Sequence, residues 1–405
     1  GLERVGEVAR RMALLPVAVP VVTIAGTNGK GTTAAALEAL LIAGGRRPGT
    51  YTSPHLLRFN ERIRVAGQEV GDEAIVAAFD DIESARGDTS LTYFEFATLA
   101  ALWVFRDSKA DVLVLEAGLG GRLDAVNIVD PAVAVITGIA LDHQDWLGDD
   151  LDAIAREKAG ILRRDGLAVI ADAGPPPGLR AAVEAAGARA LFAGRDFHWR
   201  VDSQQWQAQL QGRDGARVLL EGIPASPLLP SNLCAALQAL LLLGDDPRQL
   251  AVADILGKLR VPGRRQSREV AGRHYILDVA HNPQAIEALL EYIASTPCFG
   301  KTIAIFSAMR DKDLQGMLST TSGVFDAWFL ADQPDNRRSA DASDIADVLR
   351  DEGEFMLSVS KNLRQAFRRA QSVMAEGDRL VVFGSFFTVA AVLPLLEKEE
   401  DRTRS

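Results

Sequence analysis

The sequence predicts an α/β protein that folds into two domains. Its 405 residues are more than one hydrophobic core usually serves. From residue 19 onward, apolar runs of strand length alternate with amphipathic segments, which is typical of a mostly parallel sheet covered by helices. A second series of the same kind begins after Pro262 and Gly263. We therefore place the boundary near residues 261–264 and expect domains at residues 1–262 and 263–405.

The first domain is expected to contain a mostly parallel, doubly wound sheet. After an apolar run at residues 19–22, further strands are predicted at residues 112–116, 132–137, 167–171 and 189–192. The amphipathic segments at residues 73–85, 94–105 and 152–162 predict helices between these strands. Residues 197–221 alternate with period two around a Gly-Arg-Asp-Gly turn, so we expect an antiparallel ribbon at the edge of this sheet.

The second domain is expected to be smaller and Rossmann-like. Its strands are predicted at residues 275–279, 302–307, 327–331, 355–359 and 379–383, and a plausible helix follows each of them. Because this is a complete α/β series, the second domain should form a sheet of its own.

Composition argues against several classes of function. With 48% hydrophobic and 24% charged residues, the chain reads as an ordinary globular protein. Its 44 basic and 54 acidic residues give a net charge of −10, and no basic block offsets it. We therefore expect no binding to nucleic acid or to an anionic membrane. The longest apolar run, residues 235–243, is too short to span a membrane.

The two cysteines predict a reducing compartment. Cys234 and Cys298 are far apart and belong to no C-x-x-C pattern, so we read them as reduced thiols of a cytoplasmic protein.

We expect this protein to be a monomer. The opening GLERVGEV looks trimmed, and no signal peptide is expected before it.

Residues 23–33 read TIAGTNGKGTT and form a candidate phosphate-binding loop. Gly26 and Gly29 would let backbone N–H groups converge without obstruction by a Cβ atom. A helix beginning near Thr32 would add unpaired amides and the positive end of its dipole. Lys30 would supply a charge for phosphate oxygens. The loop therefore has the chemistry that a phosphate requires.

This loop departs from the general pattern G-x-x-x-x-G-K-[ST] at two positions. Ile24 stands where the first glycine would be, and Gly31 replaces the hydroxyl that would bind a metal ion. An ordinary glycine-rich turn with a surface lysine therefore stays open as an alternative. If a phosphate does bind, its magnesium ion must be held by residues elsewhere.

Polar residues follow the predicted strands of the first domain, and ligands of open α/β sheets bind beyond the carboxyl ends of strands. Glu116 ends one strand and precedes the glycine-rich AGLGGRLDAVN. Beside a phosphate loop it is a candidate magnesium ligand, although it could instead cap a helix or form a salt bridge. Asp142 and His143 end GIALDH. His143 could complete a metal site, but a lone histidine after a strand is more often structural.

Further polar residues follow strands of the second domain and lie at the domain boundary. The first strand ends in DVAHNP, with Asp278 and His281, and the last is followed by Ser385. Lys158, in the amphipathic AREKAGIL, is by itself most simply read as a solvated lysine paired with an acid. Arg264, in VPGRRQ, could be a hinge residue or a phosphate or nucleotide contact.

Taken together, these segments resemble one family, the folylpolyglutamate synthases and bifunctional dihydrofolate synthases of the Mur ligase superfamily of ATP-dependent amide-forming enzymes. The matching segments are GTNGKGTT, YTSPHLLRFNERIRV, SLTYFEFATLAALWVF, LEAGLGGRLDAVNIV, GIALDHQDWLG, AREKAGIL, VPGRRQ, LDVAHNP, the AMRDKD loop and FGSFFTV. They span nearly the whole chain in the order of the family. The resemblance also accounts for the phosphate loop, because GTNGKGT with glycine after the lysine is the form that this family uses. It implies a P-loop ATPase sheet in the first domain.

The resemblance implies a set of nucleotide, metal and catalytic residues. ATP would be bound by Gly26, Thr27, Asn28, Gly29, Lys30, Gly31, Thr32, Asn232, Arg264 and Asp278. The implied metal ligands are Ser53, Glu116 and His143, for two magnesium ions, with a monovalent cation such as K⁺ as a further cofactor. Lys30, Lys158 and His281 are the implied catalytic residues. Lys158 matches the lysine that these ligases carbamylate, a modification that replaces an ammonium group with an anion.

The resemblance also implies the substrates and their contacts. Thr92, Phe94, Asp124 and Ala125 resemble positions of the pteridine pocket, and His281 and Ser385 match positions near the incoming L-glutamate. A carboxylate is a poor acyl donor, so dihydropteroate or folate would first attack the γ-phosphate of ATP and form an acyl phosphate. The amine of glutamate would then attack the acyl carbon and release phosphate.

Three other functions stay open at this point. The nearest is a folylpolyglutamate synthase without activity on dihydropteroate; SLTYFEF and GRLDAVN favour the bifunctional type, whereas the short start of the chain lacks most of a loop associated with dihydropteroate. A Mur ligase that acts on a cell-wall nucleotide would need an additional N-terminal domain. A nucleotide-binding switch would not need Ser53, Glu116, His143 and Lys158 together.

Overall fold

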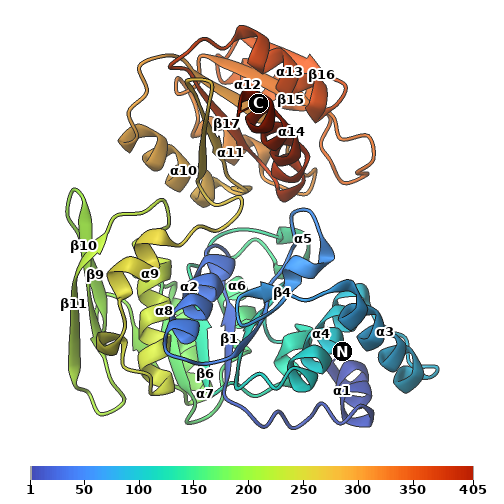
Figure 1. Cartoon of the computed structure of the whole chain (residues 1–405), viewed down its shortest axis with the longest axis vertical. Coiled ribbons are helices and arrows are strands. Elements are labelled where there is room, and N and C mark those ends of the chain that lie inside the picture. Colours follow the sequence, from blue (N-terminus) through green and yellow to red (C-terminus); the bar gives the residue numbers. More distant parts are fainter. Residues whose placement is uncertain (1, 405) are drawn as a thin grey trace. The chain divides into compact units, whose positions relative to one another are not determined.

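The chain forms two compact units. A computed structural model describes residues 2–404, apart from the side chains of Asp145, Leu147 and Arg404 (Figure 1). The first unit combines residues up to 141 with residues 147–259, and the second combines residues 142–146 with the chain from residue 260 onward. The functional division into residues 1–262 and 263–405 stays a prediction.

The first unit is built around a large, mostly parallel sheet with the strand order β4-β3-β2-β5-β1-β6-β7-β8. Its strands are β1 (Val21–Ala25), β2 (Pro48–Tyr51), β3 (Ile63–Val65), β4 (Gln68–Glu69), β5 (Val112–Glu116), β6 (Val133–Ile136), β7 (Leu167–Ile170) and β8 (Arg189–Phe192). β1, β5 and β6 are buried on both faces, as their continuous apolar runs predict. β2, β3 and β4 pair antiparallel at one edge. The predicted fold class, with a mostly parallel sheet and antiparallel edge strands, is confirmed.

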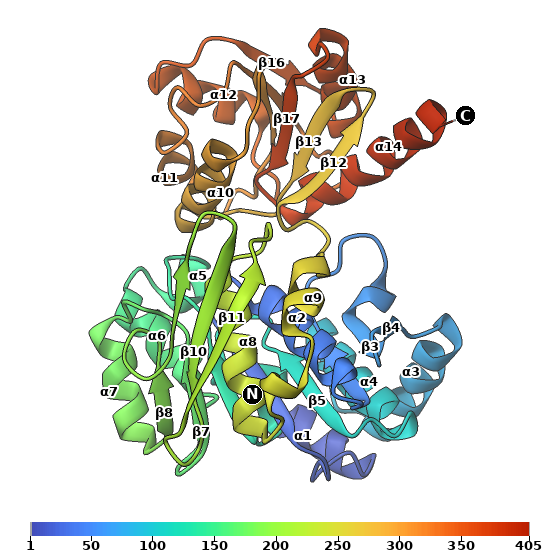
Figure 2. The same ribbon diagram turned by 60° about the vertical axis from the view of Figure 1, so that its left-hand side comes forward.

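Helices cover both faces of this sheet (Figure 2). The helices of this unit are α1 (Leu2–Arg11), α2 (Lys30–Ala43), α3 (Asp72–Arg86), α4 (Tyr93–Asp107), α6 (Leu151–Ala159), α7 (Pro177–Ala186), α8 (Pro230–Leu243) and α9 (Val252–Lys258), with 3₁₀ turns η1 (Phe59–Arg62), η2 (Ala125–Ile128) and η3 (Pro247–Gln249). The short helix α5 (Gln144–Leu147) falls largely in the segment of residues 142–146 that belongs to the second unit. α8 is apolar nearly all round because it packs against α2 and the sheets. Helix α2 begins at Lys30 rather than near Thr32, since Gly29 is its N-cap.

One prediction about this unit was wrong in its placement. The antiparallel ribbon predicted in residues 197–221 is present, as β9 (His198–Val201), β10 (Gln205–Gln211) and β11 (Arg217–Pro224), but it forms a separate small sheet instead of extending the large one. Trp206, Ala208 and Leu210 are buried on one face of β10, which packs against α8. The ribbon therefore buries its apolar face on a helix and does not use a strand edge.

The second unit contains a sheet with the order β12-β13-β17-β14-β15-β16. Its strands are β12 (Gln266–Val270), β13 (Arg273–Leu277), β14 (Thr302–Phe306), β15 (Ala327–Ala331), β16 (Leu357–Ser360) and β17 (Arg379–Phe383). Its helices are α10 (Pro283–Ser295), α11 (Leu314–Ser319), α12 (Ala342–Asp351), α13 (Leu363–Val373) and α14 (Phe386–Arg404). All of its strands run parallel except β12, whose polar sequence QSREV hid it from prediction. Contacting rings of Phe306, Trp328 and Phe383 fill its core.

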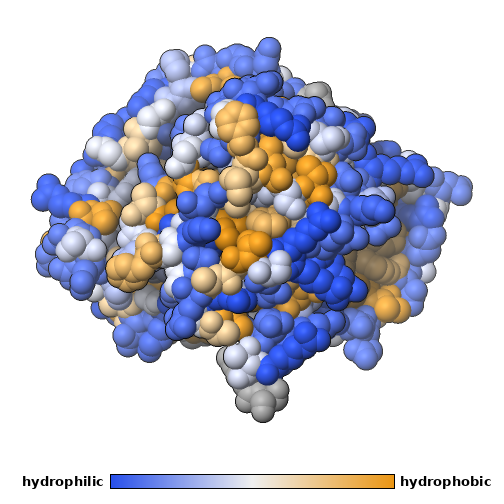
Figure 3. Space-filling view, turned by 90° about the horizontal axis from the view of Figure 1, so that it is seen from above, coloured by the Kyte–Doolittle hydropathy of each residue, from blue (hydrophilic) through white to orange (hydrophobic). Residues whose placement is uncertain are grey.

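The surface is largely polar. Figure 3 shows one face of the molecule on which hydrophilic residues predominate and hydrophobic side chains form separate patches. Within residues 2–404, the helices are all too short or too polar to cross a membrane.

Candidate active site

The loop between β1 and α2 can be made only with glycine at two positions. Gly26 has a φ of 150° and Gly29 a φ of 90°, and side chains rarely accompany such backbone angles. A Cβ atom at Gly26 would lie 1.7 Å from Oγ1 of Thr137, and one at Gly29 would lie 2.2 Å from Oδ1 of Asn232. The loop is therefore pressed against β6 and α8, with its backbone unobstructed.

Two lysines converge on one backbone carbonyl of this loop. Lys30 Nζ donates hydrogen bonds to the carbonyl oxygens of Gly26, at 3.0 Å, and Thr27, at 3.1 Å. Lys158, from α6, is only 4% exposed, and its Nζ donates to the same Gly26 oxygen at 2.8 Å. Two ammonium groups this close repel each other, so an anion bound beside them would be strongly favoured. The reading of Lys158 as a solvated surface lysine was wrong, because α6 turns it into the interior.

The loop after β6 holds the phosphate loop in place. Thr27 N–H donates to the Gly138 carbonyl at 2.8 Å, and Thr27 Oγ1 exchanges hydrogen bonds with the backbone of Ala140 at 3.0 and 3.1 Å. These bonds tie the β1 loop to the neighbouring strand of the sheet. Its conformation is therefore set before any ligand binds.

Glu116 and Ser53 offer oxygen ligands next to this loop. Glu116 is 3% exposed at the end of β5, where it is the register partner of Ile24 on β1. Its Oε2 accepts a hydrogen bond from the backbone N–H of Ser53 at 3.0 Å. Across the described part of the chain, no three His, Cys, Asp or Glu side chains are grouped to hold a metal ion. A carboxylate with a nearby hydroxyl nevertheless fits Mg²⁺, which keeps several waters and takes phosphate oxygens as ligands.

His143 does not join Ser53 and Glu116 within the first unit. It lies in the segment of residues 142–146 that belongs to the second unit, and its φ of 53° is unusual for a residue with a side chain. Its Nε2 lies 3.8 Å from Asp142 Oδ2. Its role as a metal ligand stays a prediction.

The residues predicted for the pteridine come together on one side of the first unit. Thr92 caps α4, and Phe94, the second residue of that helix, packs so closely on Gly118 that a Cβ there would lie 2.7 Å from its ring. Asp124 accepts hydrogen bonds from the N–H groups of Gly118, at 2.8 Å, and Leu119, at 2.9 Å. Asp124 caps the 3₁₀ turn that begins at Ala125, which is also buried.

Burial sets the acidity of Asp124. It raises the pKa of this carboxyl to about 6, although the N–H donors and the charge of Lys30 act in the opposite direction. An ionised Asp124 is a hydrogen-bond acceptor at neutral pH, which suits the amino and ring N–H donors of a pterin.

In the second unit, Asp278 organises the turn that carries Arg264. Its carboxylate accepts hydrogen bonds from the N–H groups of Arg265, at 2.8 Å, and Ala280, at 2.7 Å. Burial raises the pKa of Asp278, and the positive charge of Arg264 opposes this shift. The Arg264 guanidinium lies over the Phe386 ring, 4.9 Å from its centroid. Arg264 thus packs on Phe386, and its role as a nucleotide contact stays a prediction.

His281 belongs to a charged cluster that the sequence did not reveal. Its Nδ1 lies 2.7 Å from the Val279 carbonyl oxygen, which can only accept, so Nδ1 carries a proton. Its Nε2 lies 3.3 Å from Asp142 Oδ2, and Lys312 Nζ contacts the other oxygen of Asp142. Burial alone would raise the pKa of Asp142, but the hydrogen bond and charge of His281, with the charges of His143 and Lys312, hold it well below its usual value.

Sequence reasoning missed Asp142 and Lys312 as site residues. Both follow strands, Asp142 after β6 and Lys312 after β14, in the segments GIALDH and AMRDKD. Their position after parallel strands was the available signal. Their pairing could not be inferred, because 170 residues separate them in the sequence.

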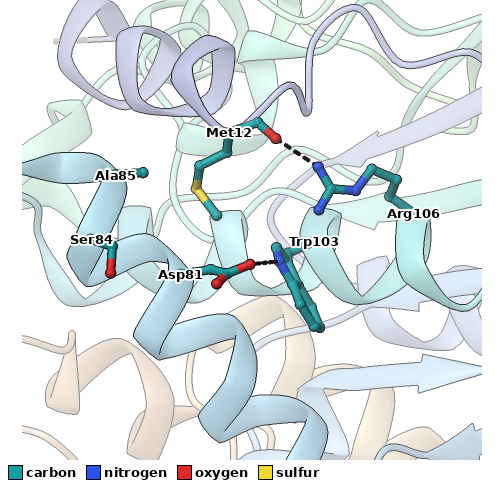
Figure 4. Close-up of a pocket in the computed structure, with 6 residues that line it drawn as sticks. All are labelled: Met12, Asp81, Ser84, Ala85, Trp103 and Arg106. Atoms are coloured by element: carbon teal, nitrogen blue, oxygen red, sulfur yellow. Dashed lines mark hydrogen bonds between the residues drawn. The ribbon is translucent and has the colours of Figure 1, made fainter.

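A small cavity of about 310 Å³ lies elsewhere in the first unit (Figure 4). Residues of α3 and α4 line it together with Met12. Two pairs of its polar groups are bonded to each other: Trp103 Nε1 donates to Asp81 at 2.7 Å, and Arg106 Nη1 donates to the Met12 carbonyl at 2.6 Å. None of the predicted site residues lines this cavity, so we do not assign the chemistry to it.

Comparison with known proteins identifies the family. The family model of the Mur ligase middle domain matches residues 24–219, and that of the Mur ligase glutamate ligase domain matches residues 263–386. The dihydrofolate synthase/folylpolyglutamate synthase of Escherichia coli is 42% identical over 98% of this chain and 91% of its own length. The chain belongs to this family. The bifunctional enzyme of Haemophilus influenzae is 36% identical over 98% of the chain and 93% of its own length.

Solved structures of this family share the fold. E. coli FolC in complex with DHPP and ADP superposes with a TM-score of 0.91 at 40% identity, covering 100% of this chain and 94% of that one. A bifunctional folylpolyglutamate synthase/dihydrofolate synthase with Mn, AMPPNP and L-glutamate bound gives 0.89 at 39% identity, covering 98% and 94%. The predicted family, fold class and enzyme class of ATP-dependent ligase are confirmed. The individual site residues stay predictions.

Proposed function

We propose that this protein joins L-glutamate to 7,8-dihydropteroate, giving dihydrofolate, and to the glutamate tail of reduced folates, with conversion of ATP to ADP and phosphate. The observation that carries the proposal is the meeting of Lys30 and Lys158 on the Gly26 carbonyl, beside the buried carboxylate of Glu116. Membership in the dihydrofolate synthase/folylpolyglutamate synthase family supports it.

The first unit would hold the phosphates and the acyl donor. Backbone N–H groups of residues 26–32 and the ammonium of Lys30 bind the β- and γ-phosphates. The pterin lies against Phe94 and hydrogen bonds to Asp124, so its carboxylate is oriented to attack the γ-phosphorus. The new bond joins a carboxylate oxygen to phosphorus, the bond from phosphorus to the β,γ-bridging oxygen breaks, and ADP leaves.

Magnesium is the cofactor expected beside these groups. Ser53 and Glu116 would hold one ion and His143 would contribute to a second, with K⁺ as a further cation. Bound magnesium supplies positive charge that offsets the charge of the phosphoryl oxygens. The buried carboxylate of Glu116 is kept in place for this purpose by the Ser53 N–H.

Lys158 is proposed to act as a carbamate. Its neutral amine would combine with CO₂, and one proton would be released as the N–C bond forms. The anionic product would no longer donate from an ammonium group to the Gly26 carbonyl and would become an oxygen ligand for a cation.

The second unit would bind the amine donor. His281 and Ser385 stand near the incoming glutamate, and Asn232, Arg264 and Asp278 contribute to the nucleotide. The glutamate nitrogen attacks the acyl carbon, the bond from this carbon to the phosphate oxygen breaks, and the amine loses a proton. Residues 1–262 would hold most of the ATP contacts and the pteroate, and residues 263–405 would hold glutamate with two contacts to ATP. We propose that the protein acts as a monomer.

Phosphate release tests the proposal. Purified protein with ATP, magnesium and glutamate is assayed with 7,8-dihydropteroate and, separately, with tetrahydrofolate. We expect glutamate-dependent phosphate release with both acceptors and none from a Lys30→Met variant. Release with tetrahydrofolate alone would indicate a monofunctional folylpolyglutamate synthase, and release with neither would refute the ligase.

A further inference from the structure

Four neighbouring strands of the second unit end in polar residues at the same edge of the sheet. β13, β17, β14 and β15 are adjacent and parallel, and their carboxyl ends lead to His281, Ser385, Ser307 and Gln333. Ser307 is fully buried and Ser385 is 3% exposed, whereas Gln333 is half-buried. Gln333 and His281 are therefore the two residues of this row that are accessible at the surface.

The hydroxyl groups of Ser307 and of Thr388, which lies in α14 next to this row, both donate to backbone carbonyls in the interior. Ser307 Oγ donates to the Ala331 carbonyl at 2.9 Å, and Thr388 Oγ1 donates to the Ser307 carbonyl at 2.6 Å. Carbonyl oxygens only accept hydrogen bonds, and a hydroxyl has a single proton to give. Both protons are therefore committed to backbone carbonyls.

This arrangement decides what Ser385 can do. Its Oγ lies 2.7 Å from Thr388 Oγ1, whose proton is already used, so Ser385 must be the donor in this pair. The same Oγ accepts from the Thr388 N–H at 3.1 Å, as the cap of α14. Ser385 thus has one lone pair left for a ligand and no proton, so it can only accept a hydrogen bond from a substrate.

The same logic orients the Gln333 amide. Its Nε2 lies 2.9 Å from Ser307 Oγ and 3.5 Å from Thr388 Oγ1. Because these two oxygens have no proton to give, they accept, and the nitrogen end of the amide must face them. Oε1 is then turned away from the row, and among the described residues no hydrogen-bond donor contacts it. Gln333 also presents an acceptor.

We propose that Gln333 is a further substrate-recognition residue, whose Oε1 accepts a hydrogen bond from the α-amino group of the incoming glutamate together with Ser385 Oγ. The inference rests on the proposed function. Glutamate has two carboxylates, which only accept hydrogen bonds, and one amine, which alone can donate to a pair of acceptors. Bonds from two of its N–H groups would aim the nitrogen lone pair and so position the nucleophile.

The test compares glutamate with glutarate, the same diacid without the amine. We expect Gln333→Leu to raise the KM for glutamate roughly three- to tenfold, as loss of a hydrogen bond to the neutral amine does, with the KM for ATP unchanged. The inhibition constant of glutarate should change less than about twofold. Equal weakening of both diacids, or an unaltered KM for glutamate, would overturn the proposal.

Three variants control for structural effects. Gln315→Leu removes an exposed amide on α11 of the same unit and should leave glutamate kinetics as they are. Thr388→Ser keeps the inward-pointing hydroxyl and should resemble the natural enzyme. Thr388→Val has the same shape but removes the acceptor of the Ser385 proton, so that this proton can point toward the ligand. The variant should therefore weaken the binding of glutamate more than the binding of glutarate. Equal behaviour of Thr388→Ser and Thr388→Val would contradict the assigned proton directions.

Binding measurements separate this inference from the proposed function. Calorimetry with glutamate or glutarate, in the presence of a non-hydrolysable ATP analogue, applies the same comparison without turnover. Glutamate binding without any phosphate release would refute the ligase while leaving the amine contact in place. Phosphate release with unchanged glutamate binding by Gln333→Leu would refute the amine contact alone.

Discussion

The two units present opposite chemical groups at the carboxyl edge of the same kind of sheet. In the first unit, glycines expose backbone N–H groups and two lysines converge on one carbonyl. In the second unit, neutral acceptors are fixed by inward-pointing hydroxyl protons. The first arrangement suits a phosphate and the second an amine. In both units the ends of the parallel strands determine where a ligand can bind. The charges and hydrogen-bond directions of the side chains in the following loops determine which kind of ligand fits there.

Two buried aspartates sharpen this contrast. Asp124 is surrounded mainly by backbone N–H donors, and burial raises its pKa to about 6. Asp142 touches His281 and Lys312, and these partners outweigh burial and lower its pKa. Burial is similar in both, so the presence of contacting cations decides the direction of each shift.

The largest expected effect comes from removing a charge at the phosphate edge. Lys158→Met keeps the volume of the side chain but removes the nitrogen that would carry the carbamate. We expect kcat to fall by about a hundred- to a thousand-fold, with the melting temperature little changed, as for loss of a preorganised electrostatic contact. Lys361→Met, at a surface lysine of the second unit, is the matched control. Full activity of Lys158→Met would show that this lysine is ordinary.

The two aspartates should respond to pH in opposite directions. A raised pKa means that folded Asp124 holds its proton more tightly than the unfolded chain, so its contribution to stability falls as pH rises from about 4 to about 6. The loss amounts to about 3 kcal/mol for a shift from 3.8 to about 6. Asp142 stabilises the fold at pH values above about 4, and this stability is lost as pH falls below that range.

Denaturant titrations from pH 2 to 8 measure both contributions. The unfolding free energy of the natural protein minus that of Asp124→Asn should decline between pH 4 and 6 and then level off. The same difference for Asp142→Asn should shrink as pH falls below about 4. Parallel curves for the two variants would contradict the assignment of their environments.

A methyl group at the phosphate loop should have a smaller effect on the fold and a specific effect on ATP. Gly29→Ala places a Cβ 2.2 Å from Oδ1 of Asn232, at a φ of 90°, so we expect a loss of about 2 kcal/mol in stability and at least about tenfold in ATP affinity. Gly45 has a similar φ of 78° with no atom within 4 Å of an added Cβ. Gly45→Ala should therefore lower the free energy of unfolding without weakening the binding of ATP. Equal ATP affinities of the Gly29→Ala and Gly45→Ala variants would mean that the Asn232 side chain moves away from the added Cβ atom.

The smallest effect is expected at the cavity away from both edges. Trp103→Phe removes the hydrogen bond to Asp81 but keeps most of the ring. We expect a loss of about 1 kcal/mol in unfolding free energy and unchanged kinetics for ATP, folate and glutamate. A changed KM for any substrate would link this cavity to the site.

The sequence predicted the parts that local chemistry determines. The glycines and lysine of residues 26–30, and Glu116 at a strand end, were recognisable because backbone angle, charge and strand order follow from short segments. The burial of Lys158 was not, since an amphipathic helix does not reveal which polar residue turns inward. The pairing of Asp142 with Lys312 and the proton directions around Gln333 depend on residues far apart in sequence. The ribbon of residues 197–221 was recognised as antiparallel, but its packing on α8 is a tertiary choice.

Transfer of an oxygen atom tests the central claim most directly. The acceptor, dihydropteroate or a reduced folate, is labelled with oxygen-18 in its carboxylate, and the phosphate formed with ATP and glutamate is analysed by mass spectrometry. Attack of the carboxylate on the γ-phosphorus predicts that one labelled oxygen appears in each phosphate released. Unlabelled phosphate formed alongside the glutamate adduct would contradict the acyl phosphate route and the role assigned to the phosphate edge.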